Sequence, residues 1–98
     1  MKYKLSELFH ENIAIGVETR KEANELCRYL HKMKRRWQGG ESYATNNHWN
    51  VYYSKTYYHL KSNTFGKKYY MSDKTCVKYK DVRHLFYGSR FHMKEFDI

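Results

Sequence analysis

The sequence predicts an α+β fold: a single two-layer domain over residues 1–98, with one long helix (about 19–36) packed on a mostly antiparallel sheet of three to five strands. Three observations predict it. Residues 12–18 alternate large and small apolar side chains, and the segment after them repeats apolar side chains at helical spacing. The chain beyond residue 50 is rich in tyrosine and β-branched residues. The expected order is β-α-β-β-β-(α).

The first two elements are short. Residues 3–10 fit a helical turn that directs its two leucines and its phenylalanine inward. In residues 12–18, two isoleucines and a valine alternate with Ala14 and Gly16, which predicts a strand. The small residues share its second face, so we expect close packing there.

The long helix has a start signal and a stop signal. Thr19 and Glu22 have the spacing of a capping box, in which the hydroxyl accepts from the N3 amide and the carboxylate reaches back. The apolar residues that follow at helical spacing are Ala23, Leu26, Cys27, Leu30, Met33 and Trp37. Gly39 and Gly40 are placed to end the helix through a left-handed C-cap.

The second half reads as loop, strand and hairpin. Residues 41–50 are polar and predict a loop, and the aromatic segment 51–60 predicts one long strand or two short ones. Residues 63–66 predict a turn. Segments 67–72 and 75–81 flank an Asp-Lys pair and predict a hairpin.

The chain is expected to finish on a helix and a docked tail. Asp81 is placed to cap a short helix that bears Val82, Leu85 and Phe86. The tail from residue 88 onward holds two phenylalanines and a methionine, which are enough to dock on the domain.

The charge is strongly positive and unevenly spread. The chain has 19 basic and 10 acidic residues, a net charge of +9. Residues 19–36 carry seven basic and two acidic side chains, and residues 55–98 carry ten basic and four acidic ones. Residues 1–18 and 37–54 each have a net charge of −1, so the positive charge lies in two blocks. Such a field favours a polyanion, either nucleic acid or an acidic protein surface. A lysine-rich proteome is the alternative explanation.

Each basic block has two interpretations. Lys21, Arg28, Lys32 and Arg35 share one helix stripe opposite the apolar face. This stripe needs no binding partner if it is simply the solvent-facing side of the helix, where cations complement the helix dipole. However, a solvent-facing side usually mixes acidic and basic residues. In residues 55–70, lysines alternate with tyrosines, a combination typical of surfaces that bind single-stranded nucleic acid. The alternative is that these tyrosines are partly core and partly rim.

No catalytic or metal signature is present in the sequence, so we expect a non-enzymatic protein without cofactor or metal. The six histidines and two cysteines form no H-x-x-x-H or C-x-x-C pattern. "NNHWN", 46–50, is similar in three residues to the active-site strip of small His-Asn nucleases, but no metal ligands stand at fitting spacing; we expect His48 to be a surface histidine. Cys27 and Cys76 are typical of buried intracellular thiols, and a disulfide between them stays open.

The N-terminus predicts no secretory signal. "MKYKLSELFHENIAIG" carries acidic residues and lacks a continuous apolar core. No segment approaches the ~20 apolar residues that span a bilayer. We therefore expect a protein of the cytoplasm, with no membrane partner.

Part of the chain resembles a class of very small proteins encoded by phages and prophages of Gram-positive bacteria. The shared pattern is a short strand, a Thr-x-x-Glu-Ala helix, a tryptophan after the helix, then W-x-x-Y and a tyrosine-rich strand. Its positions here are Ile13–Val17, Thr19, Glu22, Ala23, Trp37, Trp49, Tyr52 and Tyr58. The resemblance covers about residues 12–60 and implies no catalytic residues. It implies an expected role in blocking host defence, as in anti-CRISPR proteins, within the host cytoplasm.

We therefore expect an inhibitor of a host-defence protein or ribonucleoprotein complex that acts through a Lys/Arg- and Tyr-rich surface, as a monomer or homodimer. A nucleic-acid-binding accessory protein of phage replication or regulation, which binds RNA or DNA, is the first alternative. A sponge for an anionic nucleotide signal is the second. The candidate binding residues are Lys21, Arg28, Lys32, Lys34, Arg35, Arg36, Trp37, Lys55, Tyr58, Lys67, Lys68 and Tyr69.

Overall fold

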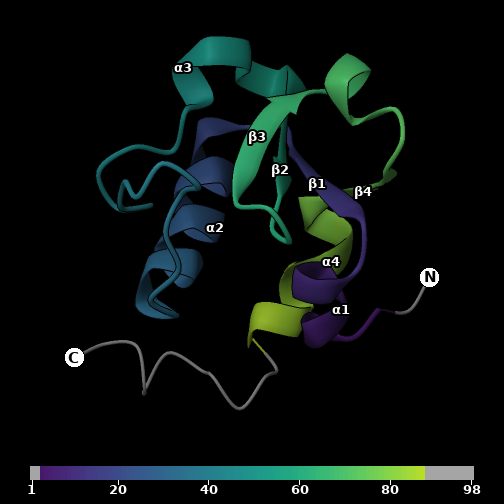
Figure 1. Ribbon diagram of the computed structural model, residues 1–98, viewed down its shortest axis with the longest axis horizontal. Helices are drawn as coiled ribbons and strands as arrows, with labels where there is room; N and C mark the ends of the chain where they lie inside the picture. Colours follow the sequence, from purple (N-terminus) through teal and green to yellow (C-terminus); the bar gives the residue numbers. More distant parts are fainter. Residues whose placement is uncertain (1–2, 88–98) are drawn as a thin grey trace.

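The computed structural model describes residues 3–87 and confirms an α+β fold with one mixed sheet (Figure 1). Its elements are α1 (Leu5–His10), β1 (Ile13–Val17), α2 (Arg20–Lys32), α3 (Trp49–Tyr52), η1 (Tyr53–Lys55), β2 (Thr56–His59), β3 (Thr64–Lys67), η2 (Lys68–Met71), β4 (Thr75–Lys78) and α4 (Tyr79–Tyr87), where η marks a 3₁₀ turn. The tail predicted to dock, from residue 88 onward, lies outside the described residues. Within residues 3–87, no helix combines the length and apolar character needed to cross a membrane.

The four strands lie in the order β3-β2-β1-β4. β1 pairs antiparallel with β2 and parallel with β4, and β2 pairs antiparallel with β3. The predicted number of strands and their mostly antiparallel pairing are confirmed. The predicted hairpin of 67–72 with 75–81 is wrong, because β4 joins the sheet at the far edge, beside β1. β3 and β4 lie at opposite edges of the sheet, and β4 runs parallel to β1, so the chain has to cross the sheet between β3 and β4. Residues 68–74 make this crossing.

β1 is buried on both faces. Ile15 lies between Tyr58 of β2 and Val77 of β4, and these side chains share the core with α2. On the other face Gly16 lies opposite Tyr57, and a Cβ on Gly16 would come within 2.7 Å of the Tyr57 ring. The small residues of this strand therefore allow the close packing that their pattern predicts.

α2 begins where the sequence predicts. The Thr19 hydroxyl accepts a hydrogen bond from the Glu22 N–H at 3.1 Å. The Glu22 carboxylate accepts from the Glu18 N–H at 2.8 Å, one residue before the position that a capping box predicts. The residues that the helix buries are Ala23, Leu26, Cys27, Tyr29 and Leu30. Cys27 and Cys76 are both free thiols, the first buried and the second half-buried.

The end of α2 differs from the prediction. The helix has 13 residues and stops at Lys32, so a single long helix over 19–36 is wrong. Lys34 adopts the left-handed conformation with φ 65°, and the N–H of the next residue donates back to Leu30 O at 3.0 Å. This is the Schellman arrangement, built here on lysine instead of glycine.

The two glycines predicted to stop α2 belong to a later turn. Gly40 has φ 93°, and its N–H donates to Trp37 O. The chain has already left the helical path, because Arg35 donates through Nη2 to Leu60 O at 2.7 Å and the Trp37 side chain enters the core. These two side chains, rather than the glycines, decide where the helix stops.

Two predicted boundaries in the second half are also wrong. Residues 49–55 are helical, since Asn47 Oδ1 accepts from the Trp49 N–H and starts a turn where the aromatic pattern predicts a strand; β2 is only the last part of 51–60. The predicted turn 63–66 falls mostly within β3, which pairing with β2 holds extended.

The short final helix is confirmed as α4, although Asp81 lies in its first turn instead of at its N-cap. The helix starts earlier because the buried Tyr79 donates its hydroxyl hydrogen to Glu25 at 2.7 Å and anchors the first turn on α2. The Tyr29 and Phe86 rings stack with centroids 5.3 Å apart, so α4 covers the core beside α2.

The left-handed Lys34 provides a test of this helix end. Lys34→Gly and Lys34→Ala remove the same charge, but only glycine adopts positive φ without cost. We expect the glycine variant to exceed the alanine variant by about 1 kcal/mol in free energy of unfolding. Urea denaturation of both variants measures this; equal stabilities would contradict the helix end described above.

Candidate functional site

The segment from residue 41 to 50 is an ordered loop, fixed by hydrogen bonds from side chains of the core. The buried Trp37 donates through Nε1 to Asn46 O at 2.7 Å, and the buried Tyr58 donates through its hydroxyl to Asn47 O. The Tyr43 hydroxyl, also buried, donates to Asn63 Oδ1 at 2.9 Å. Burial raises the pKa of both tyrosines, so their hydroxyls stay protonated and able to donate at neutral pH.

Trp37 is the centre of an aromatic cluster under this loop. Its ring centroid lies 4.3 Å from that of Tyr43, 4.6 Å from that of His48 and 5.6 Å from that of Phe65. His48 also stacks on Phe65, with centroids 4.1 Å apart. The histidine predicted to lie at the surface is half-buried, with its ring packed against Trp37 and Phe65 while it lines a surface hollow.

Asparagine side chains shape the backbone of the loop. Asn46 Oδ1 accepts from the His48 N–H at 2.8 Å, and Asn47 Oδ1 accepts from the Trp49 N–H at 2.9 Å. These turns hold His48 at φ 58°, a left-handed conformation that non-glycine residues seldom adopt. The asparagines therefore supply the hydrogen bonds that keep this strained position in place.

A cleft of about 480 Å³ lies between this loop and α2. Four asparagines line it together with Arg28 and His31: Asn24, Asn46, Asn47 and Asn50. Cys27 forms part of its floor, and burial raises the pKa of this thiol to about 12. The thiol is thus neutral, and the polar chemistry of the cleft comes from amides and cations.

A basic face continues from the cleft along α2. Lys21, Asn24, Arg28 and His31 are exposed and spaced so that they form one stripe about 15 Å long. Arg28 also lines a hollow towards the helix start, and His31 lines another towards Arg36 at the helix end. The stripe therefore connects three adjoining hollows of the surface.

The cations of this face lack acidic partners. Within residues 3–87, no carboxylate forms an ion pair with Lys21, Arg28, Lys34 or Arg36. Four basic residues outside this face are neutralised, whereas Lys55, Lys61, Lys67 and Lys68 also have no ion-pair partner within residues 3–87. The pairs are Lys78 and Lys80 with Glu18, Lys74 with Asp73, and Arg83 with Glu25. α2 and the residues that follow it thus carry one of two groups of uncompensated cations, and the one that borders the cleft.

Several predicted binding residues lie elsewhere. Trp37 and Tyr58 are buried in the core. Arg35 is half-buried, with its guanidinium 4.5 Å from the centre of the Phe9 ring, so it holds α1 and the β2–β3 turn instead of joining the exposed stripe. Lys32 is half-buried at the last turn of α2. The side chain of Tyr69 lies outside the described part of the chain.

The second basic block lies apart from the C-terminal half of the first. Lys67 pairs with Thr56, which pairs with Val17, so Lys55, Lys67 and Lys68 lie at the end of the sheet where α2 begins. α2 then runs back along the sheet, so its basic C-terminal end lies at the opposite end of the molecule from η2 (Figure 1). The second block is therefore separate from the cleft.

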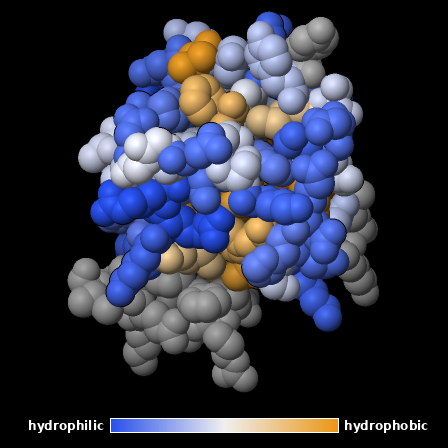
Figure 2. All heavy atoms as spheres, viewed as in Figure 1, coloured by the Kyte–Doolittle hydropathy of each residue, from blue (hydrophilic) through white to orange (hydrophobic). Residues whose placement is uncertain are grey.

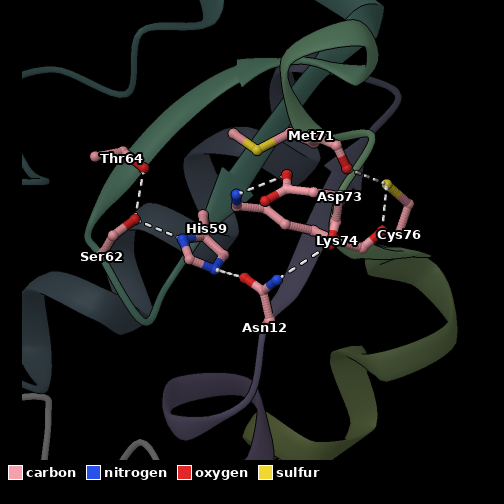
Figure 3. Close-up of polar contacts among 8 residues, drawn as sticks. All are labelled: Asn12, His59, Ser62, Thr64, Met71, Asp73, Lys74 and Cys76. Atoms are coloured by element: carbon pink, nitrogen blue, oxygen red, sulfur yellow. Dashed lines mark hydrogen bonds and ion pairs between the residues drawn. The ribbon is translucent and has the colours of Figure 1, made fainter.

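A second polar cluster lies on the other face of the sheet (Figure 3). His59 is 5% exposed, with Nδ1 bonded to Ser62 Oγ and Nε2 to Asn12 Oδ1 at 2.9 Å. Asn12 Nδ2 donates to Asp73 O, and Ser62 Oγ also bonds Thr64 Oγ1. These are residue types of a nucleophilic triad, but both ring nitrogens are engaged and the ring is buried. The cluster ties together the ends of β1, β2 and β3 and the start of β4.

Comparison with protein-family models, curated proteins and solved structures finds no match to this chain. The resemblance to small phage proteins accordingly stays a prediction. The site residues that sequence reasoning missed are the asparagines of the cleft. Clustering of Asn in "NNHWN" is their only signal in the sequence, and Asn24 joins them only through the fold.

Two Trp→Phe variants, one at Trp37 and one at Trp49, test the hydrogen bond from the Trp37 indole to the loop. Trp37→Phe leaves Asn46 O without its donor, which is expected to cost about 1–3 kcal/mol beyond the lost volume. Trp49 is equally buried, but its indole N–H makes no hydrogen bond within residues 3–87, so Trp49→Phe measures the volume term alone. Urea unfolding of both variants gives the difference. A Trp49→Phe loss as large as that of Trp37→Phe would contradict the role of this hydrogen bond.

Stability is expected to fall in mild acid. Burial lowers the pKa of His48 and of His59 below the ordinary 6.5; nearby Glu41 opposes this at His48, while Lys74 and Lys61 add to it at His59. The unfolded chain therefore binds more protons below about pH 6.5, and the free energy of unfolding falls as the pH drops from there towards the folded pKa values. Denaturation at pH 7.5, 6.5 and 5.5 measures this. His59→Gln should flatten the dependence, and an unchanged slope would exclude His59 as its source.

Proposed function

We propose that this chain is a small non-enzymatic binding protein that contacts nucleic acid through the basic face of α2. The observation that supports it is the row of cations without acidic partners that runs from Lys21 on α2 to Arg36 after it, beside a cleft whose described lining residues include no carboxylate. An unpaired Lys or Arg that neutralises a phosphate releases the counterions condensed on the nucleic acid, and this release supplies a large share of the affinity.

The character of the surface agrees with a polar partner. Figure 2 shows hydrophilic residues over most of the visible face, with the strongest colour on the side where α2 and the following loop lie. The apolar areas of this face are small and separate. In the part of the chain that the structure describes, the large exposed hydrophobic residues are Val51, Tyr53 and Tyr70. A polar partner therefore fits this face better than an apolar one.

The host-defence inhibitor expected from the sequence is the more specific form of this proposal. In that form the nucleic acid belongs to a nucleoprotein complex, and the α2 face occupies the surface where guide or target strand would lie. A positively charged inhibitor cannot imitate DNA, because a DNA mimic presents carboxylates. The support for this form is the basic face together with the resemblance of residues 12–60.

Salt dependence of binding tests the proposed face. Each phosphate contacted on a single strand contributes about 0.7 to the slope of log affinity against log salt. Arg28→Ala and Lys21→Ala are expected to weaken binding to a fluorescent single-stranded oligonucleotide and to reduce this slope by about 0.7 each. Fluorescence anisotropy over a range of salt concentrations measures both.

The matched control removes two cations from the separate block. Lys67→Ala combined with Lys68→Ala is expected to change the net charge by more and the slope by less than Arg28→Ala does. A larger effect from the control pair would move the interface to the β3 end. The same variants in cleavage assays of host-defence nucleoprotein complexes test the specific form, which requires inhibition by the native chain and its loss in Arg28→Ala.

A further inference from the structure

The hydrogen-bond partners of the cleft asparagines determine which side-chain atom is the oxygen and which is the nitrogen. Backbone N–H groups can only donate, so the atoms that accept from His48 and Trp49 must be Oδ1 of Asn46 and Oδ1 of Asn47. The side-chain nitrogen of Asn47 is therefore a donor, and it donates to Asn24 Oδ1. The direction of these amides thus follows from the chemistry of their neighbours.

The fourth asparagine is oriented in the same way. Arg20 Nη2, which can only donate, bonds Asn50 Oδ1 at 2.9 Å. Asn24, Asn46 and Asn50 therefore use their carbonyl oxygens within the protein. Their NH₂ groups make no hydrogen bond within residues 3–87. The cleft thus presents three amide donors.

The other polar groups of the cleft add donors and positive charge. Arg28 is exposed at its edge and contributes a guanidinium without an acidic partner. The Thr45 hydroxyl donates to Ser42 O, and none of the residues that line the cleft in the described range carries a carboxylate. Tyr43 is 2% exposed, so it offers no ring for a base to stack on. A ligand rich in acceptors and negative charge fits this chemistry.

We propose that the cleft binds a phosphate monoester, either the terminal phosphate of a strand held along α2 or the phosphate of a mononucleotide. The strand form rests on the proposed function. A monoester carries about −1.5 to −2 charge and three acceptor oxygens, one more free oxygen than the diester of an internal linkage. Three amide donors and Arg28 match the monoester, and about 480 Å³ is room for a ligand of nucleotide size.

Asparagine-to-aspartate variants test the cleft without disturbing the loop. Asn46→Asp keeps the oxygen that accepts from the His48 N–H, and Asn50→Asp keeps the oxygen that accepts from Arg20. Each replaces a free donor by an anionic oxygen that repels phosphate. Ser72→Asp is the charge-matched control, because Ser72 is exposed next to η2, which packs on the face of the sheet opposite α2.

The probes separate the two sources of the phosphate. A 3′-labelled single strand with a 5′-phosphate is compared with the same strand ending in a 5′-hydroxyl, and with a 5′-hydroxyl strand one nucleotide longer that carries a similar total charge. Adenosine monophosphate is compared with adenosine by calorimetry. Thermal unfolding of each variant confirms that it is folded.

We expect at least one monoester probe to bind roughly tenfold or more tightly than its hydroxyl counterpart, and Asn46→Asp and Asn50→Asp to abolish that preference while Ser72→Asp keeps it. Equal binding of phosphate and hydroxyl probes overturns the cleft proposal and leaves the basic face standing if the strands still bind. Binding of adenosine monophosphate without binding of any strand supports the cleft and overturns the proposed function. A preference that survives both aspartate variants also overturns the cleft.

Discussion

The indole of Trp37 is the contact on which both the core and the cleft depend. Its ring lies against Tyr43, Tyr58 and Phe65, and its N–H reaches Asn46 O. The same side chain therefore fills the space beneath the sheet and fixes the backbone that carries the asparagines. Trp37 can occupy this position only because the chain turns sharply at Lys34, where α2 ends. If the helix continued for another turn, the indole would remain on the helix path and the loop would lose its anchor.

The turn at Lys34 also divides the cluster of cations that follows α2. Arg35 turns inward to Leu60 O and the Phe9 ring, where it joins α1 to the β2–β3 turn. Lys34 and Arg36 remain exposed and continue the surface that His31 begins. A run that looks uniform in the sequence therefore contains one structural cation between two exposed ones. Substitution of Arg35 should destabilise the fold more than substitution of Arg36, since only the first leaves the buried Leu60 carbonyl without its donor.

The parts that could be predicted from the sequence depend on local physics, and those that could not depend on distant partners. The Thr19 cap, the alternation in β1 and the tight packing at Gly16 involve signals within a few residues of each other or the absence of a side chain. The parallel pairing of β4 with β1 joins residues about sixty positions apart, and no local pattern encodes it. The sequence places the helix end at the glycines because glycine is a strong stop signal in general, whereas lysine at positive φ has no sequence signal. The cleft was missed because Asn24 meets Asn47 only after α2 is packed beside the loop.

The basic stripe acts on a ligand at long range, and the amide donors of the cleft act on it only at short range. Charges act over distances comparable to the Debye length and attract any polyanion, so Lys21 and Arg28 can draw a strand towards α2 without selecting among strands. An amide N–H acts only at hydrogen-bond distance, and its direction matters. Each free NH₂ of the cleft belongs to a side chain whose own carbonyl oxygen is already bonded, so binding requires little further ordering of that side chain. Attraction by the stripe and selection by oriented amides are therefore separable, and variants of Arg28 and of Asn46 should differ in salt dependence as well as in affinity.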